Sequence, residues 1–302
     1  MERLVIIDGN HLIHRAFHAI QSPLKTSWGE QTNALYGFGS MLLNILDAEK
    51  PDYLALTFDE KAPTFRHDEH EGYKATRAKA PDELHAQIPR VREMMQALQV
   101  PIFSQEGFEA DDLIGTLATH AKKKGLMVFI VTGDRDALQL INDHVFVVFP
   151  HKGYKDPEVM DRQKVIHKFG VTPEQIVDYK ALMGDSSDNI KGVEGIGPKN
   201  AVKLLQEYGS LDGIYAHLDE INGGNYDKLA SGRDAAYFSQ RMARIVCDVP
   251  IDFDSEKTRV SKLDFAGLKR FFETMEMRSL AKRLQSFINE KAPLSSGQMS
   301  LF

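Results

Sequence analysis

The stretch LVIIDGN at residues 4–10 ends a short apolar run with an aspartate, Asp8. Similar apolar runs follow at residues 53–58, 100–103, 127–132 and 145–149. Helix-like stretches lie before or between these later runs, at residues 36–49, 83–98 and 111–124. Strands that alternate with helices are typical of an α/β fold, so we predict a central, mostly parallel sheet flanked by helices.

The strand-like runs stop after about residue 160. Helical segments then dominate, at residues 162–169, 173–183, 198–208, 233–246 and 264–290. We therefore expect an α/β domain at residues 1–160, a helical region at 161–290 packed on it, and a flexible tail at 291–302. The tail prediction rests on the Pro, Ser and Gly residues of APLSSGQMSLF.

Composition narrows the class of protein. The chain has 302 residues, 42% hydrophobic and 26% charged, as in an ordinary globular protein. Its only cysteine, Cys247, excludes an internal disulfide and a thiolate zinc cluster. No apolar run approaches the roughly 18 residues of a membrane span, so we expect a cytoplasmic protein with no membrane partner. The net charge of −6 argues against nucleic-acid binding, because such proteins usually carry an excess of basic residues. If many of the acids share one metal site, however, bound cations offset their charge and the basic residues remain free to meet phosphate.

Carboxylates cluster at the ends of the predicted strands and at two helix or loop starts. Because the carboxyl ends of parallel strands share one edge of the sheet, the strand-end acids should converge there. Singly, each acid could be a helix cap or a turn former. The nine candidate metal ligands are Asp8, Asp59, Glu109, Asp111, Asp112, Asp134, Asp136, Asp185 and Asp188.

Bound cations would make such a cluster tolerable. Two like charges 4 Å apart repel by about 4 kcal/mol at an effective dielectric constant of 20. Oxygen ligands without cysteine favour Mg²⁺ or Mn²⁺, and so many carboxylates could hold two or more ions. His11, His14 and His18 share one predicted helix face and offer a weaker zinc alternative, because no HExxH motif accompanies them.

Two further segments suggest phosphate binding. GVEGIG at residues 192–197 fits neither a dinucleotide motif nor a P-loop, and it predicts a hairpin between two helices. Gly195 and Gly197 would let backbone N–H groups approach duplex DNA, with Lys199 beside them. A tight helix–helix connection without a ligand is the alternative.

The polar insertion at residues 61–81 is the second segment. Its Lys74 and Arg77 are three positions apart and would point the same way on a helix, and Tyr73 offers a ring for base stacking. Arg15 and Arg66 lie close in sequence to strand-end acids, where they could contact phosphate. A solvated loop is the alternative interpretation of this insertion.

Several motifs in order resemble the 5′-nuclease of bacterial DNA polymerase I and its stand-alone flap endonuclease relatives, over about residues 1–285. They are DGN (8–10), TFD (57–59), TFR (64–66), YKATR (73–77), EADD (109–112), TGDRD (132–136), ALMGDSSDNI (181–190) and GVEGIGPKNA (192–201). Asn200 departs from the Thr that relatives often have. The resemblance implies a PIN-like flap endonuclease fold with a helix-hairpin-helix-like motif.

The resemblance also implies an activity, namely metal-dependent removal of 5′ flaps and RNA primers from branched duplex DNA in replication and repair. Asp8, Asp59, Glu109, Asp111 and Asp112 would surround the first metal. Asp134, Asp136, Asp185 and Asp188 would serve the second, with Asp134 needed for turnover. Lys74 and Arg77 would act in a helical arch at about residues 61–90, and the hairpin would bind a monovalent cation such as K⁺.

Other interpretations stay open at this point. The chain could be a branched-DNA-binding module without catalysis, or a ribonuclease of the same fold. In the polymerase I family this nuclease is commonly the N-terminal part of a longer protein. The sequence leaves open whether a polymerase follows Phe302 in the natural protein. It also leaves open the substrate preference and the oligomeric state. The tail residues Gln298, Leu301 and Phe302 resemble peptides that dock on the bacterial sliding clamp, although they could instead fold back on the helical region.

Overall fold

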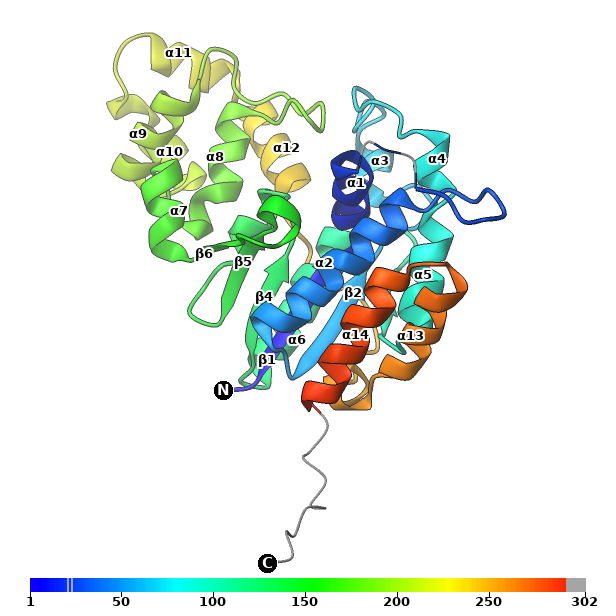
Figure 1. Cartoon of the computed structure of the whole chain (residues 1–302). Helices are drawn as coiled ribbons and strands as arrows, with labels where there is room; N and C mark the ends of the chain where they lie inside the picture. The colour runs from blue at the N-terminus through cyan, green and yellow to red at the C-terminus, as the bar shows by residue number, and fades with distance from the viewer. Residues whose placement is uncertain (21, 23, 292–302) are drawn as a thin grey trace, which may run out of the picture.

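A six-stranded sheet forms the centre of the protein in the computed structural model, which describes residues 1–20, 22 and 24–291 (Figure 1). The strand order is β3-β2-β1-β4-β5-β6. All neighbouring pairs are parallel except β5 and β6, which are antiparallel. The strands are β1 (Arg3–Asp8), β2 (Tyr53–Thr57), β3 (Ile102–Phe103), β4 (Met127–Val131), β5 (Val145–Phe149) and β6 (Glu158–Met160). The predicted α/β class is confirmed, while the short β6 was not predicted.

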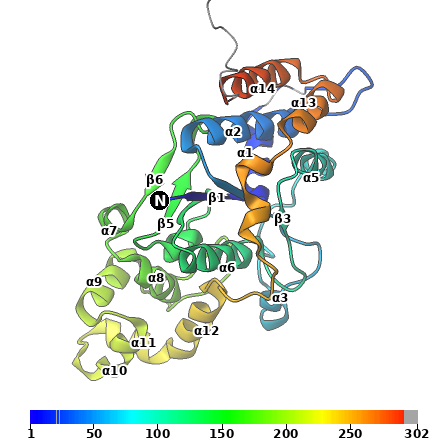
Figure 2. The same ribbon diagram turned by 90° about the horizontal axis from the view of Figure 1, so that it is seen from below.

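Helices cover both faces of the sheet (Figure 2). The α-helices are α1 (Gly9–Ala19), α2 (Asn33–Glu49), α3 (Phe65–Glu69), α4 (Asp82–His85), α5 (Ile88–Ala97), α6 (Ala110–Lys123), α7 (Arg162–Phe169), α8 (Ile176–Met183), α9 (Pro198–Tyr208), α10 (Leu211–Ala216), α11 (Gly224–Ser231), α12 (Arg233–Ala243), α13 (Phe265–Thr274) and α14 (Arg278–Lys291). Short 3₁₀ turns connect them, including η1 (Asp136–Leu140).

The alternation of side chains along β1 divides the core into two layers. Val5 and Ile7 pack with α1, α2 and α5, whereas Leu4 and Ile6 pack with α6 on the opposite face. Successive residues of a strand point to opposite faces, so a continuous apolar run suits a strand that is covered on both sides. Burial of β1 on both faces fixes the position of Asp8 at the carboxyl edge.

The helices that follow the sheet divide into two groups. Helices α8, α9 and α10 share a core with the α6 face of the sheet. Helices α13 and α14 instead return to the opposite face and pack with α2 and α5 (Figure 1). The predicted helical region at 161–290 therefore does not form one unit, because the apolar faces of α13 and α14 complete the core around α2. No helix within the described residues is long and apolar enough to cross a membrane.

Candidate active site

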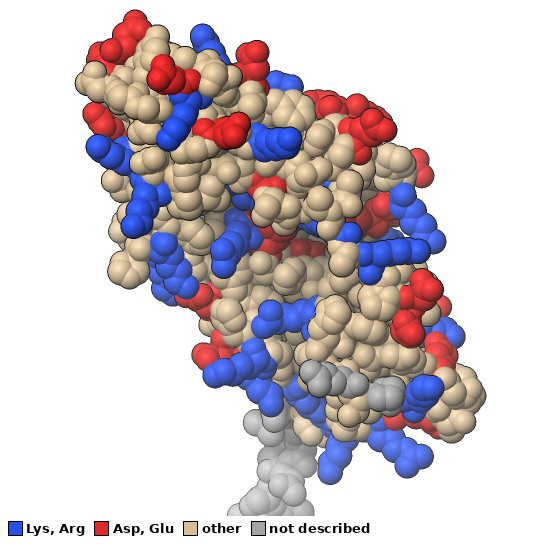
Figure 3. Space-filling view, turned by 90° about the horizontal axis from the view of Figure 1, so that it is seen from above, with Lys and Arg blue, Asp and Glu red and all other residues tan. Residues whose placement is uncertain are grey.

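Carboxylates from several strands line one cavity at the carboxyl edge of the sheet. The cavity has a volume of about 410 Å³. A space-filling view shows acidic side chains in a central hollow and basic side chains around its rim (Figure 3). Seven of the nine predicted ligands line this cavity, namely Asp8, Asp59, Glu109, Asp111, Asp134, Asp136 and Asp188. Asp185 lines the adjacent cavity together with Asp134 and Asp136.

Asp8 sits between β1 and α1 and is 5% exposed. Its Oδ1 accepts a hydrogen bond from the backbone N–H of His11 at 2.9 Å, which caps α1. Its Oδ2 accepts one from Thr132 Oγ1 at 2.6 Å. Burial raises the pKa of Asp8 to about 7, although these two hydrogen bonds oppose the shift, and the charges of Asp59 and Asp134 add to it.

Asp111 resembles Asp8 in its surroundings. Burial raises its pKa well above the ordinary value, and the charges of Asp134, Asp8 and Glu109 raise it further. Asp134, whose charge acts on both, is held by two hydrogen bonds: its backbone N–H donates to Thr132 Oγ1 at 3.0 Å, and its Oδ1 accepts from the Asp136 N–H at 2.9 Å. Removing these acids from water without a full set of counter-charges is costly, and a bound cation would offset that cost.

Stability without metal should therefore fall as the pH rises through the window set by Asp8. The folded protein keeps a proton on Asp8 up to a pH of about 7, whereas the unfolded chain releases it near the ordinary value of 3.8. Stability is thus highest below pH 4 for this group and is lost toward pH 7, by up to about 1.4 kcal/mol per pH unit. Urea unfolding in EDTA would measure this slope. Asp8→Asn should reduce this slope and leave the part that Asp111 contributes, and an equal slope in that variant would contradict the assignment.

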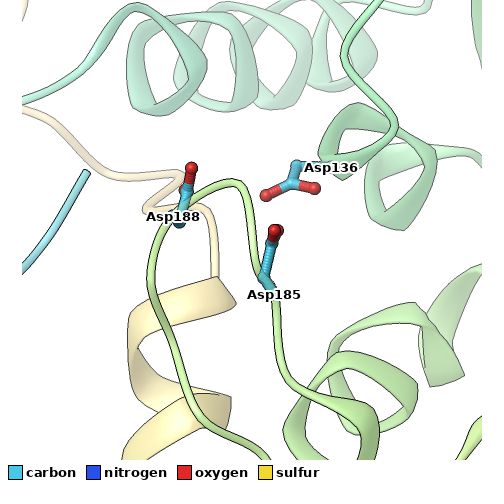
Figure 4. A group of neighbouring side chains, drawn as sticks. All are labelled: Asp136, Asp185 and Asp188. Atoms are coloured by element: carbon cyan, nitrogen blue, oxygen red, sulfur yellow. The ribbon is translucent and has the colours of Figure 1, made fainter. Parts of the chain in front are cut away.

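Asp136, Asp185 and Asp188 form a second, compact group (Figure 4). One ligand oxygen from each lies within 4.8 Å of the others, a span that a single ion can bridge. Asp136 begins η1, and the other two lie in the loop after α8, which a backbone bridge between Asp185 and Ile190 closes. Among the described residues, this is the one set of three or more candidate ligands whose ligand atoms lie this close together. Neither the alternative zinc ligands His11, His14 and His18 nor the acids around Asp8 and Asp111 form such a set in this structure.

Lys180 also belongs to this group, although the sequence did not suggest it. Its Nζ contacts Asp136 Oδ1 and donates to Asp185 Oδ2 at 2.6 Å. The pKa of Asp185 is lowered to about 2: burial acts to raise it, and the Lys180 ammonium and the Ser187 hydrogen bonds outweigh burial. The last turn of α8 places Lys180 here, and its spacing from Asp185 was the available signal.

Asp112 and Arg66 have roles that differ from the prediction. Asp112 is completely buried, and both of its oxygens bind the Arg66 guanidinium, at 2.7 and 2.8 Å. Arg66 is 3% exposed and also donates to the carbonyls of Met242 and Arg244. We predicted Asp112 as a metal ligand and Arg66 as a DNA contact. In this structure neither charge is free for that role, because each is paired with the other inside the protein, although Arg66 also lines the carboxylate cavity.

The cationic segment of the insertion, residues 73–77, lies folded onto the carboxylates. Lys74 Nζ donates to Glu109 Oε1 at 2.6 Å, and Arg77 Nη2 donates to Asp188 Oδ1 at 2.5 Å. Tyr73 is 4% exposed, and its hydroxyl lies 3.1 Å from a carboxylate oxygen of Glu109 and 3.1 Å from one of Asp188, either of which can accept its single proton. The predicted stacking role of Tyr73 is therefore wrong for this conformation, since its ring is packed inside the protein. Lys74 and Arg77 do lie at the cavity, as the sequence suggested.

Two other side chains shape the cavity. Asn10 donates to Asp59 Oδ2, and the N–H of Ala110 donates to Asp59 Oδ1 at 2.7 Å, so exposed Asp59 is held at the entrance to α6. His11 packs against the loop after β4, where a Cβ on Gly133 would lie 1.9 Å from its Nε2. Glycine at position 133 therefore permits the close approach of α1 to the loop that carries Asp134.

Arg15 lies beside the carboxylate cavity and not inside it. It lines a second hollow of about 840 Å³ together with His14, His18, Lys152 and Lys155. The wall with the lysines is held in place because Asn44 Nδ2 donates to the Gly153 carbonyl at 2.7 Å. This hollow is a concentration of positive charge next to the acids.

The glycine hairpin precedes α9 and is exposed at Gly195, Gly197 and Lys199, while Val193 and Ile196 anchor it in the core. Gly195 has a φ of +77°, which favours glycine. No atom lies within 4 Å of a Cβ built on Gly197, so the backbone at the start of α9 is open to a ligand. Lys228 Nζ donates to the Gly195 carbonyl at 3.2 Å. The predicted clamp-binding residues Gln298, Leu301 and Phe302 lie outside the described residues.

Comparison with known proteins defines the class to which this fold and site belong. Residues 3–170 match the family model described as the 5′-3′ exonuclease N-terminal resolvase-like domain. Residues 171–266 match that of the 5′-3′ exonuclease C-terminal SAM fold. The chain therefore belongs to the 5′-3′ exonuclease family, which confirms the resemblance seen in its motifs.

Two bacterial DNA polymerases are similar to the chain in sequence. The chain is 46% identical over 285 residues to DNA polymerase I of Caldicellulosiruptor bescii and 41% identical over 289 residues to that of Bacillus subtilis. These matches cover 93% and 94% of the chain, but 33% and 32% of the two relatives. The chain thus spans about a third of the length of the curated relatives that it matches.

Solved structures share the fold. The T5 5′-exonuclease with bound zinc has a TM-score of 0.68 at 19% identity, covering 97% of this chain and all of that chain. The catalytic core of Rad2 in complex with a DNA substrate has a TM-score of 0.62 at 15% identity, covering 94% of this chain and 91% of that one. At these identities the likeness establishes the fold.

Proposed function

We propose that this chain is a divalent-metal-dependent, structure-selective 5′ nuclease that hydrolyses phosphodiester bonds in 5′ flaps and RNA primers of branched duplex DNA. One observation carries the proposal: seven acids of the carboxyl edge line the same cavity as Lys74 and Arg77. A substrate with phosphate groups uses both kinds of charge, with cations between the acids and the phosphate. With such a substrate, the protein would act in replication and repair in the cytoplasm.

The acids suit two or more Mg²⁺ or Mn²⁺ ions. Asp8 is buried and Asp111 half-buried, both with raised pKa values, and Asp136, Asp185 and Asp188 present oxygens within 4.8 Å. Glu109 and Asp59 complete the first set, and Asp134 lines both the carboxylate cavity and the adjacent cavity that holds Asp185. Ions held here would lower the pKa of a bound water and stabilise charge on the attacking and leaving oxygens.

Lys74 and Arg77 would bind and orient the scissile phosphate. Both now pair with acids of the cavity, Lys74 with Glu109 and Arg77 with Asp188. Once those acids are neutralised, the two cations are within reach of a phosphate at the cavity mouth. Arg77 is 46% exposed, so a small movement brings its guanidinium to the entrance.

Loss of the Lys74 charge should slow cleavage without preventing folding. Lys74→Met keeps the aliphatic part of the side chain and removes the ammonium that we assign to the phosphate. We expect the single-turnover rate on a 5′ flap to fall by about a hundredfold, the usual effect of losing one such donor. Lys79→Met, an exposed lysine of the same segment, should retain the wild-type rate. Equal cleavage rates in the two variants would show that Lys74 has no role in the reaction.

The glycine hairpin would hold the duplex part of the substrate. Gly197 has ordinary backbone angles and open space around it, so Gly197→Val should leave the fold intact. A valine there would block phosphate from the first N–H groups of α9. Loss of one or two hydrogen bonds of about 1 kcal/mol each predicts weaker duplex binding, on the order of tenfold. Fluorescence anisotropy would measure it, and an unchanged dissociation constant would refute the hairpin as a DNA contact.

Further contacts complete the proposal. Arg15 and its neighbouring lysines would meet the backbone of the same substrate. A monovalent cation such as K⁺ would bind hairpin carbonyls, where Lys228 now contacts the Gly195 carbonyl. The sliding clamp would bind Gln298, Leu301 and Phe302.

A panel of substrates separates the leading proposal from its rivals. A 5′ flap of DNA, the same flap with an RNA segment, and single-stranded RNA would each be incubated with Mg²⁺. The nuclease proposed here cuts both flaps near the junction. Binding of all flaps without cleavage would favour a non-catalytic module, and cleavage of single-stranded RNA alone would favour a ribonuclease.

A further inference from the structure

The two groups of carboxylates differ in the charges that face them. In the first group, Lys74 and Arg66 pair with Glu109, at 2.6 and 3.4 Å. Asp8 is held by a backbone N–H and a hydroxyl, and the strongest charges on Asp111 are other acids, with Lys74 acting on it more weakly. The second group already contains basic side chains. Lys180 joins Asp136 to Asp185, and Arg77 pairs with Asp188.

Lys180 is packed among the acids of the second group. Its side chain is 14% exposed, and those of Asp136 and Asp185 are 15% and 14% exposed. Asp185 Oδ1 is occupied by the N–H and hydroxyl of Ser187, at 2.9 and 2.6 Å, which leaves Oδ2 for Lys180. The ammonium connects η1 to the loop after α8, two segments that otherwise present like charges to each other.

The ammonium occupies space that a metal ion would need. An ion bound by Asp136 Oδ1 and Asp185 Oδ2 would lie between these two oxygens, both of which Lys180 Nζ contacts. A monovalent ammonium and a divalent ion cannot share this position, because their charges repel at short distance. Binding of an ion to these oxygens therefore requires that Lys180 withdraw.

We propose that Lys180 is a resident counter-cation of the second carboxylate group: it holds Asp136 and Asp185 together without metal and competes with the divalent ion for them. The inference rests on the proposed function, since it concerns the same metal site. It follows that the second group binds its ion more weakly than the Asp8–Asp111 group. Lys180 is a positioning residue in this scheme.

Mn²⁺ binding without DNA tests the proposal directly, because electron paramagnetic resonance measures the free ion. We expect a tight and a weak class of sites in the wild type, with Asp185→Asn abolishing the weak one. Lys180→Met should tighten the weak class by about tenfold or more and leave the tight class unchanged. Lys180→Arg keeps the positive charge, so Mn²⁺ should still bind weakly to this class of sites. Lys203→Met, at an exposed lysine, should bind Mn²⁺ as the wild type does.

A second readout is stability without metal. In EDTA, Lys180→Met should unfold at a lower temperature than Lys180→Arg, and saturating Mn²⁺ should narrow that difference. Unchanged or weaker Mn²⁺ binding in Lys180→Met would overturn the counter-cation role while leaving the nuclease proposal intact. Absence of any Mn²⁺ binding to the wild type would instead contradict the nuclease proposal itself.

Discussion

Asp134→Asn is expected to lower the single-turnover cleavage rate of a 5′ flap by at least about a thousandfold, a loss of about 4 kcal/mol of transition-state stabilisation. The amide can keep the hydrogen bond that Asp134 Oδ1 accepts from the Asp136 N–H, so the local fold should persist. A negative charge that lines both cavities is lost, and with it a proposed ligand for the ions that would activate water.

Affinity for DNA separates this explanation from a general loss of structure. Asp134 does not belong to the hairpin or to the cationic segment, so the dissociation constant for a flap should stay within a few-fold of wild type. Asp143→Asn provides a control at an exposed carboxylate before β5 and should be fully active. A loss of affinity as large as the loss of rate would contradict the assignment of Asp134 to catalysis.

Arg66→Ala is expected to destabilise the protein by about 3–5 kcal/mol, because it leaves the charge of Asp112 buried without its partner. Asp112 has no exposed surface through which water could replace the guanidinium. The matched control is Arg162→Ala, which breaks an ion pair with Glu174 whose side chains are 44% and 59% exposed. That surface pair should contribute less than about 1 kcal/mol.

Urea unfolding of the two variants measures the difference. If Arg66 were a DNA contact, its removal would weaken flap binding and leave the unfolding midpoint almost unchanged. A stability loss below that of Arg162→Ala would therefore restore the DNA-binding interpretation of Arg66 and contradict the buried pair.

Local patterns in the sequence were sufficient for most of the fold. Continuous apolar runs identified the five parallel strands, most clearly β1 and β2, which are buried on both faces. The position of Asp8 and Asp134 just after such runs predicted their convergence, since parallel strands end at one edge. Helices α13 and α14 were also found, but their return to α2 depends on contacts far apart in sequence that no local pattern reveals.

The errors within the site have a shared physical cause. The pairing of Arg66 with Asp112 joins positions 46 residues apart, and the Tyr73 hydroxyl reaches Asp188 across 115. A charged or aromatic residue near a motif looks the same in sequence whether it faces a substrate or satisfies a buried partner. Lys180 was missed for the same reason, because its role depends on how the last turn of α8 faces η1.

The most direct test of a metal-dependent 5′ nuclease is the fate of a DNA flap labelled at its 5′ end, incubated with this chain in Mg²⁺ and, separately, in EDTA. We predict release of the labelled strand near the junction in Mg²⁺, leaving a 5′-phosphate on the duplex, and an intact flap in EDTA. A flap that remains intact in Mg²⁺ while bound by the protein, or one that is cut equally in EDTA, would contradict the proposal.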